Sequence, residues 1–124
     1  MILVDTSVWG DHLRRGDAGL VELLDRSAVV MHPFVVGEIA CGGLRDRDLV
    51  LDLMQDLPAA LVATPDEVLK FIGIHALHGK GIGYVAVHLL ASVALTPGAR
   101  LWTRDARLQQ MAVSLDCEYA APAH

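Results

Sequence analysis

Three acidic residues, Asp5, Glu38 and Asp105, stand where their side chains could act together. Asp5 follows the apolar run 1–4, and Asp105 follows a second, largely apolar stretch, 99–102, and then Thr103 and Arg104. Runs in which apolar and polar residues do not alternate are typical of buried parallel strands. The carboxyl ends of such strands share one edge of the sheet. Glu38 lies in a third apolar segment. Three carboxylates at one edge would form the oxygen-rich site that Mg²⁺ or Mn²⁺ prefers, and such an ion can activate a water against a phosphate ester.

Hydroxyl and arginine side chains near these acids fit the same interpretation. Thr6, Ser7 and Thr103 could orient a carboxylate or bond a phosphate oxygen. Arg104 and Arg107 could contact phosphate, and either could equally be a solvated helix charge. The net charge of −5 argues against binding nucleic acid by long-range attraction alone. It is compatible with a nuclease, because acids around a metal contribute negative charge.

Each acid also has a structural interpretation. Asp5, Thr6 or Ser7 could cap the helix that follows, because all three types accept hydrogen bonds from free helix amides. Glu38 has mostly apolar neighbours and is expected to have little water within reach. It should therefore have a cation or a donor as partner, and an ion pair with Arg45 is the alternative to a metal ion.

Predicted strands and helices alternate along the chain, which is typical of a parallel sheet wrapped in helices. The strands are expected at 1–4, 28–31, 60–63 and 99–102, with an edge strand at 117–119. The helices are expected at 8–15, after a cap at Asp17, at 33–41 and 46–55, at 65–78 after a hydroxyl cap at Thr64, and at 84–95 and 106–114.

Size and composition narrow the classes of protein. The 124 residues suit one domain spanning 1–124, and 53% apolar with 5% aromatic residues predicts an aliphatic core. No apolar run approaches the ~20 residues of a membrane span, so a cytoplasmic protein is expected. Cys41 and Cys117 are too few for a disulfide framework or a zinc site and are expected to be buried thiols.

Three further features carry weaker signals. His75 and His78 lie one turn apart and could share a metal, but no acid or thiol stands beside them, which favours surface histidines. His88 falls within an apolar helix and is expected to be a hydrogen-bonded core residue. The glycine-rich stretch 79–83 lacks the Lys-Ser/Thr pair of a phosphate-binding loop, which favours a flexible connection.

Four spaced segments together carry a resemblance to a known family. They read ILVDTSVW at 2–9, VGEI at 36–39, GIGYVAVHLLAS at 81–92 and LWTRD at 101–105. In this order they resemble the PIN-domain ribonucleases, in particular the VapC toxins of bacterial toxin–antitoxin pairs. The resemblance implies a three-layer α/β/α sandwich with a central parallel sheet of four to five strands. It also implies divalent-metal-dependent RNA cleavage, homodimers and neutralisation by a VapB-type antitoxin.

The same resemblance assigns roles to residues and reveals one departure. Asp5, Glu38 and Asp105 match family acids, as catalytic and metal-binding residues, and Thr103 matches the hydroxyl that accompanies the last of them. Ala86 stands where the family has a fourth acid. The helix start there offers no acid and no side-chain cap, although its amides and dipole would favour one. We interpret Ala86 as the replacement, engineered or natural, of an aspartate, and expect weaker ion binding and lower activity.

Two classes of function fit this sequence. The first is a metal-dependent endoribonuclease, impaired at Ala86. The alternative, which Ala86 favours, is a non-catalytic PIN module that binds RNA or its antitoxin without cleavage. A phosphoryl-transfer receiver fits less well, because it would want a second acid directly behind Asp5, where Thr6 and Ser7 stand.

Overall fold

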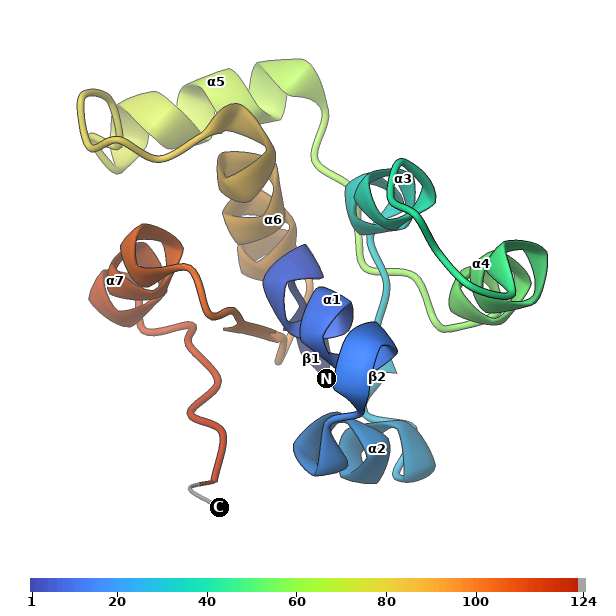
Figure 1. The fold of residues 1–124 in the computed structure, drawn as a ribbon. Helices are drawn as coiled ribbons and strands as arrows, with labels where there is room; N and C mark the ends of the chain where they lie inside the picture. The colour runs from blue at the N-terminus through green and yellow to red at the C-terminus, as the bar shows by residue number, and fades with distance from the viewer. Residues whose placement is uncertain (123–124) are drawn as a thin grey trace.

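Three parallel strands lie at the centre of the molecule, with helices around them (Figure 1). The computed structural model describes residues 1–122, and its strands are β1 (Ile2–Val4), β2 (Val29–Val30) and β3 (Arg100–Trp102). Their order is β2-β1-β3, and both pairings are parallel. Because the chain places β2 on one side of β1 and β3 on the other, a crevice is expected at the carboxyl ends of β1 and β3.

Some of the helices begin at side-chain caps three residues before the amide that they bind. The Asp17 side chain accepts a hydrogen bond from the Leu20 amide at 3.0 Å, which confirms the expected cap. Thr64 and Glu67 bond each other's amides in a reciprocal capping box, which starts the helix at Pro65. The helices are α1 (Thr6–Arg15), α2 (Ala18–Asp25), α3 (Pro33–Ala40), α4 (Arg47–Gln55), α5 (Pro65–Ile74), α6 (Tyr84–Leu95) and α7 (Ala106–Ser114).

An aliphatic core holds these elements together. Leu3 of β1 pairs with Val30 on one side and Leu101 on the other, and all three are buried. Every residue of α6 from Val87 to Val93 is buried, as its apolar sequence predicts. Burial of each such side chain contributes roughly 1.5–3 kcal/mol to the free energy of unfolding. The strands that position Asp5 and Asp105 are therefore held in place by the core.

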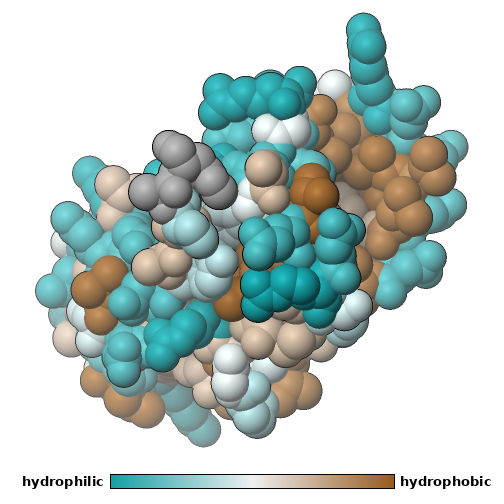
Figure 2. All heavy atoms as spheres, turned by 90° about the horizontal axis from the view of Figure 1, so that it is seen from below, coloured by the Kyte–Doolittle hydropathy of each residue, from teal (hydrophilic) through white to brown (hydrophobic). Residues whose placement is uncertain are grey.

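The surface is mixed. Figure 2 shows hydrophilic side chains interspersed with apolar patches on one face of the molecule. Several large apolar side chains are exposed, among them Leu49 and Leu53 of α4 and Leu69 and Ile74 of α5. No helix within residues 1–122 is long and apolar enough to cross a membrane.

The α/β class with a parallel sheet is confirmed, but within residues 1–122 the sheet has three strands rather than four to five. The segment expected as a strand at 60–63 forms no strand: a single bridge lies just before it, between Ala59 and Met31, and the Ala60 amide donates to the Met31 carbonyl at 2.9 Å. The segment at 117–119 likewise forms one bridge, between Glu118 and Leu101. Both segments lie alongside the sheet in the expected direction, yet each makes too few successive backbone pairs to count as a strand.

Helix α5 ends at Ile74, four residues before the expected end at 78. Ala76 adopts a left-handed conformation (φ 50°), and the Leu77 amide bonds back to the Ile72 carbonyl at 3.0 Å. This turn returns Leu77 to the core, so its apolar side chain is buried without extending the helix. His75 is the C-cap of α5 and His78 lies beyond the turn, so the two histidines are not one helical turn apart on the same helix.

Two expectations about buried side chains are wrong. Cys41 is exposed at the end of α3, and Cys117 is half-buried in the segment after α7. His88 is buried, as expected, but neither ring nitrogen has a hydrogen-bond partner within residues 1–122. Its ring instead contacts Phe34 and Tyr84, at centroid distances of 4.7 and 4.5 Å.

Candidate metal centre and an adjoining groove

The carboxyl ends of β1 and β3 lie directly beside each other. The Asp5 amide donates to the Trp102 carbonyl at 2.9 Å, which continues the pairing one residue past β1. Asp5 and the Thr103–Asp105 segment therefore leave the sheet side by side. This is the position at which open parallel sheets place ligand sites.

A hollow of about 240 Å³ opens at this edge, and we call it the acidic hollow. Asp5, Glu38 and Asp105 all line it, so the structure brings the three sequence-predicted acids to one place. Ala86 lines the same hollow, from the first turn of α6. The other lining residues are Thr6, Ser7, Val85 and Leu108.

Asp5 is held by two hydroxyl groups. Ser7 Oγ and Thr103 Oγ1 each donate to Asp5 Oδ2 at 2.7 Å, and Thr103 Oγ1 also accepts from the Asp105 amide at 3.0 Å. The Asp5 side chain makes no capping bond to α1, although it stands at the cap position. The capping interpretation of Asp5 is therefore wrong, and its buried side chain is oriented by hydroxyls instead.

Glu38 is exposed, contrary to the expectation of an apolar environment. Helix α3 buries Val35 and Ile39, which lie on one face, and Glu38 falls outside that face. Thr6 Oγ1 donates to Glu38 Oε1 at 2.8 Å. Within residues 1–122 no Lys, Arg or His nitrogen lies within 4.0 Å of Glu38, so the ion pair with Arg45 does not form.

Asp105 acts as a helix cap and also lies in the acidic hollow. Its Oδ1 accepts from the Leu108 amide at 2.9 Å and caps α7, while its position also lines the acidic hollow. Each of the three carboxylates thus uses one oxygen in a hydrogen bond to the protein. The described residues give no hydrogen bond to the second oxygen: Asp5 Oδ1, Glu38 Oε2 or Asp105 Oδ2.

This donor set fits a hard divalent cation in its chemistry. Carboxylate oxygens are the ligands that Mg²⁺ and Mn²⁺ prefer, and hydroxyl partners that orient such ligands are typical of metal sites. Within residues 1–122, however, no three His, Cys, Asp or Glu side chains lie close enough together to hold one ion. The acids share one hollow, and their free oxygens would have to turn toward one another to coordinate.

Ala86 is the third residue of α6, after the Gly83 cap position. The first turn of α6 has neither an acid nor a side-chain cap, as the sequence predicts. Its free amides and the positive end of the helix dipole face the same region as the three carboxylates. A fourth carboxylate at this position would therefore have favourable electrostatics from the helix.

Both arginines expected near phosphate have protein partners. Arg104 bonds the side chains of Asp11 and Asp17, which holds the pKa of both carboxyl groups low. Arg107 Nη1 donates to the Gly81 carbonyl at 3.0 Å. Gly81 has φ 73°, and a Cβ there would collide with the Arg107 guanidinium, so this turn is tied to α7 rather than being a free connection.

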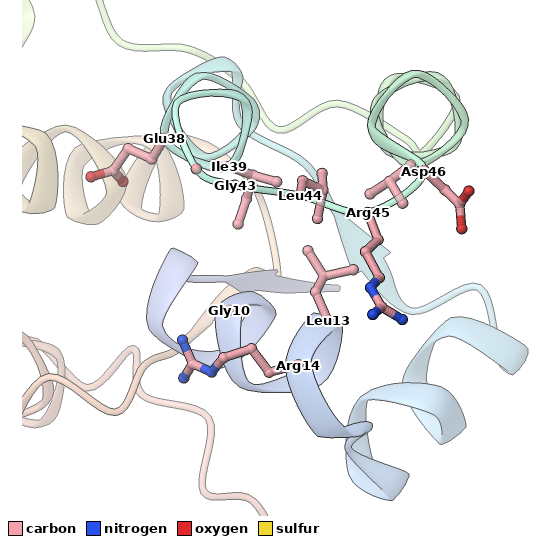
Figure 3. Close-up of a pocket in the computed structure, with 11 residues that line it drawn as sticks. Gly10, Leu13, Arg14, Glu38, Ile39, Gly43, Leu44, Arg45 and Asp46 are labelled. Carbon is pink, nitrogen blue, oxygen red and sulfur yellow. The ribbon is translucent and has the colours of Figure 1, made fainter.

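A larger groove of about 900 Å³ adjoins the acidic hollow, and sequence analysis did not predict it (Figure 3). It lies between α1 and the segment from α3 to α4. Figure 3 shows Leu13 pointing from α1 toward Ile39 and Leu44. Glu38 lines both the groove and the acidic hollow, so the two share this residue at their border. The remaining lining residues are Gly10, Arg14, Gly42, Gly43, Arg45, Asp46 and Val50.

Comparison with known proteins gives two findings. The PIN domain family matches residues 2–114. Ribonuclease VapC32 of Mycobacterium tuberculosis, in strains CDC 1551 / Oshkosh and ATCC 25618 / H37Rv, is 55% identical to this chain over 109 residues. The alignment covers 88% of this chain and 88% of each relative. The family match runs from β1 to the end of α7 and includes every residue of the acidic hollow.

Proposed function

Because this chain belongs to the PIN domain family, we propose that it is a VapC-type toxin, an endoribonuclease that hydrolyses RNA phosphodiester bonds with a divalent cation. The observation that carries this proposal is the acidic hollow, where Asp5, Glu38 and Asp105 each offer one oxygen that has no hydrogen-bond partner within residues 1–122. The similarity to a protein named a ribonuclease supports RNA as the substrate.

Asp5, Glu38 and Asp105 would hold Mg²⁺ or Mn²⁺ in this mechanism. A divalent cation held there would supply polarisation of a phosphoryl oxygen and activation of the attacking water. Ser7 and Thr103 hold Asp5 in one rotamer, and Thr6 does the same for Glu38. These hydroxyl contacts reduce the reorganisation that the carboxylates need when the ion and the phosphate arrive.

The Ala86 position lowers this activity. It faces the acidic hollow without a carboxylate, so the site has three acids where a fourth would have both room and a favourable helix dipole. The same observation favours the second candidate function, a non-catalytic PIN module that binds RNA or antitoxin. If this chain cleaves RNA in the presence of Mg²⁺ or Mn²⁺, and Asp5→Asn abolishes the cleavage, the chain is a ribonuclease and not a binding module.

Metal binding gives a test that does not require turnover. Adding Mg²⁺ or Mn²⁺ should raise the thermal midpoint, because an ion that binds only the folded chain stabilises it by about 2.7 kcal/mol at 100 times its Kd. For a chain of this size the shift is on the order of 10 °C. The shift is measured by differential scanning fluorimetry with and without the cation.

Asp5→Asn should remove that shift, because it deletes a carboxylate of the acidic hollow. Asp48→Asn is the matched control, since its side chain is 98% exposed on α4 and the shift should persist. Equal shifts in the two variants would show that the ion binds elsewhere.

The groove is the proposed docking site for a VapB-type antitoxin. Its apolar walls suit a helix or extended segment from a small protein, and its border with the acidic hollow at Glu38 would let that segment cover the acids. We also propose a homodimer, for which the exposed Leu69 and Ile74 of α5 offer apolar surface.

Leu13→Asp should weaken antitoxin binding by at least about 30-fold, because it buries a charge against Ile39 and Leu44 at the groove centre. Isothermal titration with a cognate VapB-type antitoxin measures the Kd. Val21→Asp on α2 is the control, since Val21 is exposed and lies outside the groove. Similar affinities for the two variants would place the antitoxin on another surface.

A further inference from the structure

Arg104 lies between Thr103 and Asp105, yet its side chain turns away from the acidic hollow. Its Nη1 donates to Asp11 Oδ2 at 2.7 Å, and its Nη2 donates to Asp17. The guanidinium carbon also lies 5.5 Å from the centroid of the Trp102 ring. Neighbouring side chains in an extended segment point to opposite sides, so the outward turn of Arg104 directs Thr103 and Asp105 inward.

The two acids that receive Arg104 come from separate helices. Asp11 lies on α1 and Asp17 caps α2, and their side chains are only 18% and 15% exposed. The hydrogen bond to Asp17, and to a smaller extent the one to Asp11, raises the pKa of Arg104. The guanidinium therefore stays charged throughout the physiological pH range. Arg104 thereby links the end of β3 to the two helices that follow β1. We call its contacts with Asp11 and Asp17 the arginine clamp.

The backbone next to this clamp carries the contacts of the acidic hollow. The Arg104 amide donates to Ser7 Oγ at 3.0 Å, and the Asp105 amide donates to Thr103 Oγ1 at 3.0 Å. Thr103 and Ser7 in turn both hold Asp5. A displacement of residue 104 would therefore disturb two donors to Asp5 and the position of Asp105 together.

We propose that Arg104 is a positioning residue, which sets Thr103, Asp5 and Asp105 through Asp11 and Asp17 and does not contact RNA phosphate. Turning to a phosphate would take from the partly buried Asp17 the cation that it pairs with, and would leave Asp11 only its exposed partners Arg14 and Arg15, which is costly. The significance of this role for cleavage rests on the proposed ribonuclease function. The clamp itself is a property of the folded chain and can be tested without any activity.

The first test is amide hydrogen exchange by NMR at residues 104 and 105. Arg104→Gln should speed exchange there by at least about tenfold, because bonded amides exchange only when the segment opens. Asp17→Asn should do the same, while asparagine preserves the cap of α2. Arg15→Gln is the matched control, since it removes an exposed partner of Asp11 at 3.6 Å without touching the segment. Unchanged protection in Arg104→Gln would overturn the proposal.

The second test separates positioning from phosphate contact by RNA cleavage kinetics in an Ala86→Asp background. Positioning requires a kcat that falls about 10- to 100-fold with an unchanged KM, in Arg104→Gln and in the Asp11→Asn, Asp17→Asn double variant alike. A raised KM at constant kcat, or faster cleavage when the two acids are removed and Arg104 is released, would overturn it. If no variant cleaves RNA, the proposed function fails, and hydrogen exchange still decides the role of Arg104.

Discussion

Ala86→Asp is expected to raise metal-dependent RNA cleavage by about 10²-fold, the lower end of what one preorganised electrostatic group contributes in enzyme sites. The new carboxylate would enter the first turn of α6 and face the acidic hollow beside Asp5, Glu38 and Asp105. The α6 dipole favours a negative charge there. Initial rates on a structured RNA with Mg²⁺ or Mn²⁺ measure the gain.

The comparison needs two further variants. Ala86→Asn has nearly the same shape as the aspartate without its charge, so it should stay at the level of the parent chain. Adding Asp5→Asn to Ala86→Asp should return the rate to that level, because both acids serve the same ion. If Ala86→Asp cleaves no faster than Ala86→Asn, position 86 has no part in the reaction.

Ala86→Asp should also change stability in a way that depends on the cation. Four carboxylates around one hollow repel one another, so without a divalent ion the helix dipole and the repulsion oppose each other. With the ion bound, its attraction to the carboxylates outweighs their mutual repulsion. The cation-induced rise in thermal midpoint should thus be larger in Ala86→Asp than in the parent chain.

The sequence predicted the features that arise from short stretches of chain. The caps at Asp17 and Thr64 are formed by residues three positions apart, and the apolar runs before Asp5 and Asp105 identify their strands locally. Parallel pairing then brings the two strand ends together as a geometric consequence. Glu38 reaches the same hollow because α3 follows β2 at the neighbouring strand.

The features that sequence analysis missed depend on tertiary contacts. Arg104 meets Asp11 and Asp17 across 93 and 87 residues of chain, and no local pattern marks such partners. The exposure of Glu38 depends on which face of α3 meets the core, because a mostly apolar helix of eight residues has a weak preference. The groove exists only because α1 and α4 flank the same loop.

A buried histidine makes the stability of this fold sensitive to acid. His32 is completely buried at the cap of α3, where its Nδ1 accepts from the Phe34 amide at 3.0 Å. Its Nε2 has no partner within residues 1–122. Burial, with a smaller effect from the nearby His88, lowers the pKa of His32 from 6.5 to about 4. Burial lowers the pKa of His88 as well.

The free energy of unfolding should therefore fall as the pH drops from 6.5 to about 4. The unfolded chain binds a proton at His32 in this window and the folded chain does not, so stability is complete above pH 6.5 and the loss is complete below the folded-state pKa. This pKa difference corresponds to roughly 3 kcal/mol. Carboxyl groups with low pKa, such as Asp17, lose their contribution only at lower pH. Urea denaturation at a series of pH values measures the slope.

His32→Asn tests whether His32 causes the acid sensitivity, because asparagine can still accept a hydrogen bond from the Phe34 amide but does not titrate. His32→Asn should be less stable at pH 7, since it leaves a cavity, and should lose most of the slope between pH 6.5 and 4. His75→Asn is the control, because His75 is exposed beyond α5 and its removal should leave the slope intact. An unchanged slope in His32→Asn would assign the acid sensitivity to another buried group, of which His88 is the first to examine.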